Sequence, residues 1–259
     1  MFNRGYLWFI ATSLIFMASI GLCRAQEAKQ PPAKSEVREA WRKVMVRTPF
    51  PKKGCFTASY PDKEWHEVAC STAKPFPPQV RKPGTRGSTP QVGAANGDFS
   101  AQTSGLYTSA EGTFNSVTPG VSEASNAPPG TPGATANSFS LQINTNTFTN
   151  PLTTTLCTGA ANPSMCQGWV QFVFQNNLPP AYCTACVSVW YWLVPYGGAT
   201  CPAGFTADVG DCYISSTLAP VTLTTISSLA SMTLTGKISG GNDIVILDDN
   251  NGLTASVSD

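Results

Sequence analysis

The runs GWVQFVFQ, residues 168–175, and VSVWYWLVPY, residues 187–196, decide the predicted fold together with the earlier run FSLQINTNTF, residues 139–148. Apolar and polar side chains alternate in 139–148, which is typical of a strand with one buried face. In 168–175 one face is apolar, and the other carries rings and amides. Both faces of 187–196 are largely apolar, which indicates a central strand. The three runs therefore predict neighbouring strands of one sheet.

Six ring and amide side chains of the last two runs would then share one face of the sheet. They are Trp169, Gln171, Gln175, Trp190, Trp192 and Tyr196. Flat rings stack on sugars or pack against peptide side chains, and amides orient a ligand through paired donors and acceptors. This face is therefore a candidate groove for an extended glycan or peptide. The alternative is that a second sheet covers the same face and the rings are sandwich core, a common role for aromatic residues in central strands.

Residues 1–25 have the pattern of a secretory signal peptide. Arg4 supplies the positive start, an apolar stretch follows, and Cys23-Arg24-Ala25 precedes the expected first mature residue, Gln26. An uncleaved anchor is the alternative, because the apolar stretch is close to the lower length limit of a spanning helix. No later run is long and apolar enough to span a membrane. We therefore expect a secreted or periplasmic protein without a stable membrane span once the signal is removed.

Removal of the signal leaves eight cysteines, an even number that predicts a disulfide framework in an oxidising compartment. Their spacing favours four sequential pairs: Cys55 with Cys70, Cys157 with Cys166, Cys183 with Cys186, and Cys201 with Cys212. A zinc site at 183–186 would need a second cysteine pair and usually histidine, and His66 is the only histidine. We expect no metal and no cofactor.

Composition and charge exclude some partners and divide the chain. The formal net charge is +1 and 12% of the residues are charged, so the sequence predicts no nucleic-acid partner and leaves the oligomeric state open. Residues 26–90 are expected to be a basic N-terminal arm, a loop closed by a disulfide and a Pro-rich linker. Within them, 35–47 fits either a short amphipathic helix or a flexible arm or propeptide, and we favour the arm.

Residues 91–259 are rich in Thr, Ser, Gly and Val and show no convincing helical period, which predicts a β-sandwich domain. Two of its strands are expected on either side of a turn near Glu111-Gly112, and a hairpin is expected to turn through Asn251-Gly252. The chain stops at Asp259 directly after a strand-like run. We therefore expect that one or more strands of the sandwich are absent.

CQGWVQFVF at 166–174, VWYWLVPYG at 189–197 and CPAGF at 201–205 are similar to segments of the neprosin-like secreted proteins. The chain resembles the glutamic peptidases called eqolisins more distantly, and the resemblance covers chiefly residues 139–213. It implies an all-β, lectin-like sandwich of two sheets, of the jelly-roll or concanavalin-like kind, stapled by disulfides. It also implies proteolysis at acidic pH.

Glutamic-type proteolysis needs a carboxylate to activate water and a second group to stabilise the oxyanion. The neprosin pattern places a glutamate where this chain has Cys166. The resemblance then leaves Gln171 or Gln167 for the amide role. Since no glutamate follows Glu123, the catalytic acid would be Glu111, Glu123, an aspartate or a residue of the missing tail. Three hypotheses stay open: a protein that binds an extended polymer, a glutamic-type endopeptidase, and a structural secreted domain without a ligand.

Overall fold

The computed structural model describes residues 34–77, 107–125 and 135–258. They belong to one compact unit that begins at Lys34. The expected signal peptide, residues 1–25, and the expected domain boundary at residue 90 lie outside the described residues. Within the described ranges, no helix has the length and apolar character needed to cross a membrane.

Two antiparallel sheets of six strands each form the fold. The first sheet has the order β2 (His66–Val68), β1 (Gly54–Ala58), β14 (Leu253–Ser258), β13 (Asn242–Asp248), β12 (Thr233–Ser239) and β3 (Ser109–Thr113). The second has the order β6 (Phe139–Asn144), β7 (Gln167–Asn176), β8 (Ala185–Val194), β10 (Asp211–Ser215) and β9 (Thr206–Asp208), with β11 (Ala219–Pro220) paired to β8. The remaining elements are α1 (Lys34–Arg47), α2 (Pro151–Leu156), the 3-10 turns η1 (Cys157–Gly159) and η2 (Ile226–Ser231), and the small hairpin β4 (Ala124–Ser125) and β5 (Thr135–Ala136).

The two sheets pack face to face around the largest apolar cluster of the described chain. Val170, Phe172 and Phe174 of β7 meet Val245 and Leu247 of β13 in this cluster. Alternate residues of each strand face it because successive side chains of a strand point to opposite sides. The structure is therefore a mostly β, sandwich-like fold.

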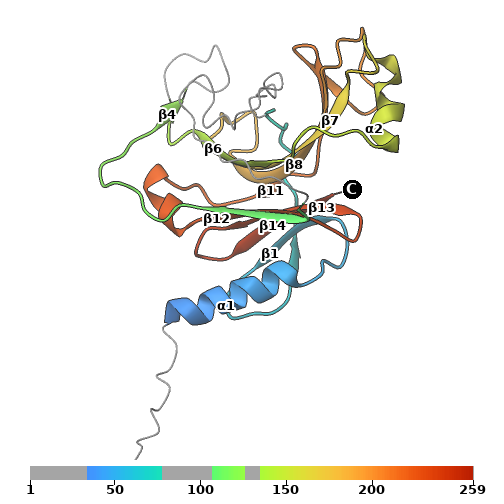
Figure 1. Cartoon of the computed structure of the whole chain (residues 1–259). Helices are drawn as coiled ribbons and strands as arrows, with labels where there is room; N and C mark the ends of the chain where they lie inside the picture. The colour runs from blue at the N-terminus through green and yellow to red at the C-terminus, as the bar shows by residue number, and fades with distance from the viewer. Residues whose placement is uncertain (1–33, 78–106, 126–134, 259) are drawn as a thin grey trace, which may run out of the picture. The chain divides into compact units, whose positions relative to one another are not determined.

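Helix α1 lies on the outer face of the first sheet, so that this sheet is the middle layer between α1 and the second sheet (Figure 1). Trp41 and Met45 of α1 are buried against Ile244 and Ile246 of β13. The expectation of a flexible arm at 35–47 was therefore wrong. The helix forms because its apolar residues find a sheet face, a tertiary contact that stabilises a short helix more than propensity does.

The three runs that led to the fold prediction are neighbouring strands, as expected. Strand β6 pairs with β7 and β7 with β8, and Trp169 lies opposite Trp192 in the register. The expected hairpin near Asn251-Gly252 also forms, because β13 and β14 pair from Asp248 and Leu253 outward. Strand β14 has β13 on one side and β1 on the other.

Other local predictions failed. Strand β3 runs through Glu111 and Gly112 without a turn, because residues 109–113 pair continuously with β12. The sequence also gave no sign of periodicity at α2, which is too short to show it. Its signal was the dipeptide Asn150-Pro151: the Asn150 side chain accepts a hydrogen bond from the Thr153 amide as N-cap, and proline follows in the first turn.

Four disulfides join the cysteine pairs expected from the spacing: Cys55–Cys70, Cys157–Cys166, Cys183–Cys186 and Cys201–Cys212. Their Cα–Cα distances lie between 5.4 and 6.0 Å, within the range that disulfides need. Such a framework is typical of proteins from an oxidising compartment.

Gly236 of β12 gives a direct test of how closely the sheets pack. A Cβ at this position would lie 2.5 Å from Phe172 Cδ2, whereas a Cβ on Gly112 of the adjacent strand would have nothing within 4 Å. We expect Gly236→Ala to lower the free energy of unfolding by about 1–3 kcal/mol, and the control Gly112→Ala to change it by less than about 0.5 kcal/mol. Urea unfolding measures both. Equal losses would show that β7 does not press on β12 here.

Candidate functional site

The outer face of the second sheet, on the side away from the first sheet, carries most of the predicted ligand-binding side chains. Trp169 lies opposite Trp192, and Gln171 lies opposite Trp190. The rings of Trp190 and Trp192 are stacked with centroids 6.3 Å apart, and both contact Tyr213 at 5.2 and 4.9 Å. We call Trp169, Val173, Trp190, Trp192, Val194 and Tyr213 the ring cluster.

Side-chain amides connect the ring cluster to the edge strand β6. Trp192 Nε1 donates to Gln171 Oε1 at 2.7 Å, and Gln171 Nε2 donates to Gln142 Oε1 at 2.8 Å. Asn144 Nδ2 donates to the same Gln142 oxygen at 3.5 Å, and Gln142 Nε2 donates to Ser140 Oγ at 3.1 Å. We call Ser140, Gln142, Asn144, Gln171 and Trp192 the amide chain.

The amide chain runs from solvent into the interior. Ser140 and Asn144 are exposed and Gln142 is half-buried, whereas Gln171, Trp190 and Trp192 are all 0% exposed. The rings of the predicted groove are therefore buried, and they do not line an open groove. The face meets solvent at its β6 end, and also at its other end, where Thr206 of β9 is exposed opposite Tyr213.

The ring cluster is not the core of the sandwich either. The side chains that meet the first sheet are the alternate ones, such as Val170 and Phe172, on the opposite face of β7. All members of the ring cluster come from β7, β8 and β10. Among the described residues, the first sheet packs on the opposite face and no other sheet covers the rings.

The remaining predicted side chains divide between two places. Gln175 is 6% exposed and lies on the same face as Gln171, four residues along β7, and Gln167 is half-buried at the start of that strand. Tyr196 lies beyond the end of β8 and packs with Cys157, Cys166 and other residues of a separate cluster. Tyr196 therefore does not join the ring cluster, because β8 ends at Val194.

Glu111 and Gln171 are not brought together. Glu111 is on β3, where Arg42 of α1 donates to its two carboxylate oxygens at 2.7 and 3.0 Å. Arg42 belongs to the helix layer, so the first sheet and the inter-sheet core lie between Glu111 and the face that carries Gln171. Hydrogen bonding to Glu39 and Glu111 raises the pKa of Arg42, so this guanidinium remains charged and holds Glu111 in place.

Two described carboxyl groups have raised pKa values. Burial raises the pKa of Glu123, whose Oε2 is buried without a hydrogen-bond partner in the described part of the chain. Burial also raises the pKa of Asp243 at the start of β13. The described hydrogen-bond partners of Gln171 are Gln142 and Trp192, so neither acid is seen beside the amide. Among the described residues, Gln171 therefore has amide and indole partners and no carboxylate partner.

Asp243 predicts a specific dependence of stability on pH. A carboxyl group whose pKa is raised by folding binds its proton more tightly in the folded state, so its contribution to stability falls as pH rises through the two pKa values. Asp243→Asn removes the ionisation. We therefore expect it to raise the melting temperature at pH 7 relative to the unmodified protein, with no gain at about pH 3. Equal shifts at both pH values would contradict a raised pKa.

The described residues show no candidate metal centre. Among the described residues, no three His, Cys, Asp or Glu side chains lie together so as to hold a metal ion. His66 of β2 is exposed and contacts Asp62, and the hydrogen bond with His66 lowers the pKa of Asp62. This pair lies on a surface hairpin of the first sheet, apart from the ring cluster.

The sequence did not single out three residues that complete the candidate site. Gln142 of β6 was visible only as part of a polar strand face. Ser188 accepts the Trp190 Nε1 hydrogen bond at 2.9 Å, and Tyr213 packs on both stacked rings. Tyr213 follows Cys212 on β10, and only the pairing of β10 with β8 reveals its place.

The chain matches no family model, no curated protein and no solved structure. The geometry of the fold therefore defines the class: a disulfide-stapled protein of two packed antiparallel sheets, in which the outer face of the second sheet is rich in aromatic and amide side chains.

Proposed function

We propose that this protein is secreted or periplasmic and binds an extended glycan or peptide on the outer face of its second sheet. The observation that carries the proposal is the amide chain, which leads from exposed Asn144 and Ser140 to buried Gln171 and Trp192. A lectin-like, jelly-roll topology belongs to the same proposal. It is supported by the sandwich of two sheets and by the rings on the outer face of the second.

The polar side chains of β6 are the first groups that a ligand meets. Ser140, Gln142 and Asn144 alternate along the strand, so neighbouring members are about 7 Å apart and form a row that suits an extended polymer. The bond from Gln171 fixes the orientation of the Gln142 amide before any ligand arrives. Groups that are already ordered lose less conformational entropy on binding.

Polymer binding can be tested on the full chain without residues 1–25. The probes are insoluble cellulose, chitin and xylan, and an array of unstructured peptides. We expect retention on one of these probes, with Gln142→Ala weakening the affinity about tenfold, the equivalent of one hydrogen bond of about 1.4 kcal/mol. Asn242→Ala, an amide substitution at the first residue of β13 in the other sheet, is the control and should bind normally. A folded sample retained on none of the probes would favour a structural domain without a ligand.

The glutamic-type endopeptidase is the weaker proposal, because Arg42 engages Glu111 and the described partners of Gln171 are uncharged. Incubation of the same sample with denatured casein from about pH 3 to pH 8 distinguishes it. Acid cleavage that Gln171→Ala abolishes, in a variant that keeps its fold, would replace the binding proposal with proteolysis.

A further inference from the structure

The N-terminal segment, residues 34–77, supplies two strands to the first sheet and a helix to the outer face of that sheet. Strand β1 pairs with β14 over five residues, from Gly54 opposite Val257 to Ala58 opposite Leu253. Among the described strands, β1 is the one that β2 pairs with. We call residues 107–125 and 135–258 the body. The segment therefore occupies an edge of the body's sheet that would otherwise offer unpaired backbone groups.

Helix α1 of the same segment buries apolar side chains against the body. Met45 is 0% exposed and Trp41 is 6% exposed. Both lie in a cluster with Ile244, Ile246 and Leu253 of the body. Without the segment, these aliphatic side chains of β13 and β14 would form an exposed apolar face.

Charges on the two parts are complementary. Arg38 donates to both carboxylate oxygens of Asp248 at 3.0 and 2.6 Å, and Arg42 donates to both oxygens of Glu111. Side chains of Arg42 and Asp248 are each 5% exposed. Lys237 of β12 donates a hydrogen bond to the Val46 carbonyl in the last turn of α1. A cation at this end of a helix also interacts favourably with the helix dipole. Bidentate pairs of this kind, each with one buried partner, fix the register of the helix on the sheet.

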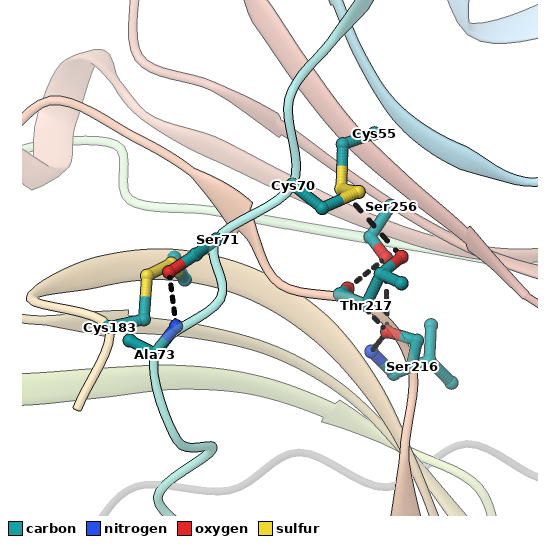
Figure 2. The surroundings of a disulfide bond; sticks show 10 residues. Cys55, Cys70, Ser71, Ala73, Cys183, Ser216, Thr217 and Ser256 are labelled. Carbon is teal, nitrogen blue, oxygen red and sulfur yellow. Dashed lines mark hydrogen bonds between the residues drawn. A yellow bond between two sulfur atoms is a disulfide. The ribbon is translucent and has the colours of Figure 1, made fainter.

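The disulfide Cys55–Cys70 closes within the segment and beside the body (Figure 2). Cys55 Sγ lies 3.7 Å from the Thr217 hydroxyl group, and the Ser71 amide donates to the Leu218 carbonyl at 2.8 Å. All eight described cysteines are used in pairs, and each pair lies wholly within the segment or wholly within the body. No disulfide between described residues therefore ties the segment to the body.

We infer that the body has a docking surface, made of the β14 edge that β1 covers and the apolar outer face of β13 and β14, that holds residues 34–77 as a non-covalent helix–strand partner. The partner it fits is a basic amphipathic helix followed by a strand and a disulfide-closed hairpin. Residues 34–77 of the same chain are that partner. The peptide connection between residues 77 and 107 is then not needed to keep the two parts together.

A cut between the two parts tests this inference. A recognition sequence for a site-specific protease is inserted between Gly87 and Ser88 of the full chain without residues 1–25, and the folded protein is cut without reductant. In the intact chain, the peptide connection keeps the two parts at an effective concentration on the order of millimolar. After the cut, the fragments stay together at about 10 µM only if their affinity for each other is high. We expect the two fragments to co-elute in size-exclusion chromatography as a 1:1 complex. Separation or precipitation of the fragments would overturn the inference. A complex of two bodies with two segments would also overturn it, since the segment would then serve a second copy.

Two neighbouring apolar residues of α1 provide matched variants. Met45 faces the body at 0% exposure, and Val44 is 54% exposed. In the cut protein, Met45→Glu should release the segment, because it places a charge in the apolar contact. Val44→Glu should leave the fragments together. Equal behaviour of the two variants would show that the apolar face of α1 does not hold the segment.

Discussion

Reduction of the four disulfides is expected to unfold this protein at room temperature. Loop-closure entropy gives about 2–3 kcal/mol for each disulfide at these short sequence separations, or about 10 kcal/mol for all four. A domain of ordinary stability has about 5–15 kcal/mol in total. The melting temperature with and without dithiothreitol, followed by circular dichroism, measures the effect. An unchanged melting temperature in a sample whose thiols are shown to be free would contradict the prediction.

The individual disulfides should differ in the order of their loop lengths. Cys55–Cys70 has a sequence separation of 15, and Cys183–Cys186 has a separation of 3. We expect Cys55→Ala with Cys70→Ala to cost about 3 kcal/mol, and Cys183→Ala with Cys186→Ala to cost about 2 kcal/mol. Urea unfolding under oxidising conditions compares the two. The opposite order would show that strain or packing outweighs chain entropy.

Trp190→Ala is expected to cause the largest loss of any single substitution in the ring cluster. The side chain is 0% exposed, stacks on Trp192, packs on Tyr213 and donates a hydrogen bond to Ser188. Removal of a buried aromatic ring costs about 3–5 kcal/mol, because the cavity it leaves refills only in part. Chemical unfolding monitored by far-UV circular dichroism measures this loss without relying on the fluorescence of the ring removed.

The control for Trp190→Ala is Phe114→Ala, since Phe114 is 44% exposed. We expect this variant to cost less than about 1 kcal/mol. A loss at Trp190 no greater than that at Phe114 would mean that the ring is not packed. If Trp190→Ala is still folded at the temperature of the binding assay, the same sample can be tested on the glycan and peptide probes. Binding that disappears there would then extend the ligand site from the amide chain to the rings.

The fold was predictable where local pattern and tertiary structure agree. Alternation in 139–148 and 168–175 identified β6 and β7, and the apolar run at 187–196 identified β8. The cysteine pairs were also predictable, because short sequence separations bring partners together whatever the topology. Helix α1 was misjudged because its apolar residues need the outer face of β13 and β14, which come some 200 residues later in the sequence.

The candidate site was predictable only in its list of side chains. Parity along β7 and β8 placed Trp169, Gln171, Trp190 and Trp192 on one face, and the register confirms that they share it. The same alternation gave a wrong prediction for Tyr196, because this residue lies past the end of β8, where side chains no longer alternate. The contribution of Tyr213 needed the pairing of β10 with β8, a contact that no sequence period encodes.

The sequence by itself determined the β class, the cysteine pairs and the identity of the ring and amide face, because each depends on residue type and short-range spacing. Only the tertiary structure decided which face of the second sheet meets the first, that Glu111 is held by Arg42 on another layer, and that residues 34–77 complete a sheet begun in the body. These outcomes depend on contacts between residues far apart in the chain. The free energy of such contacts is set by which surfaces meet, and the local pattern of a strand is the same whichever surface it meets.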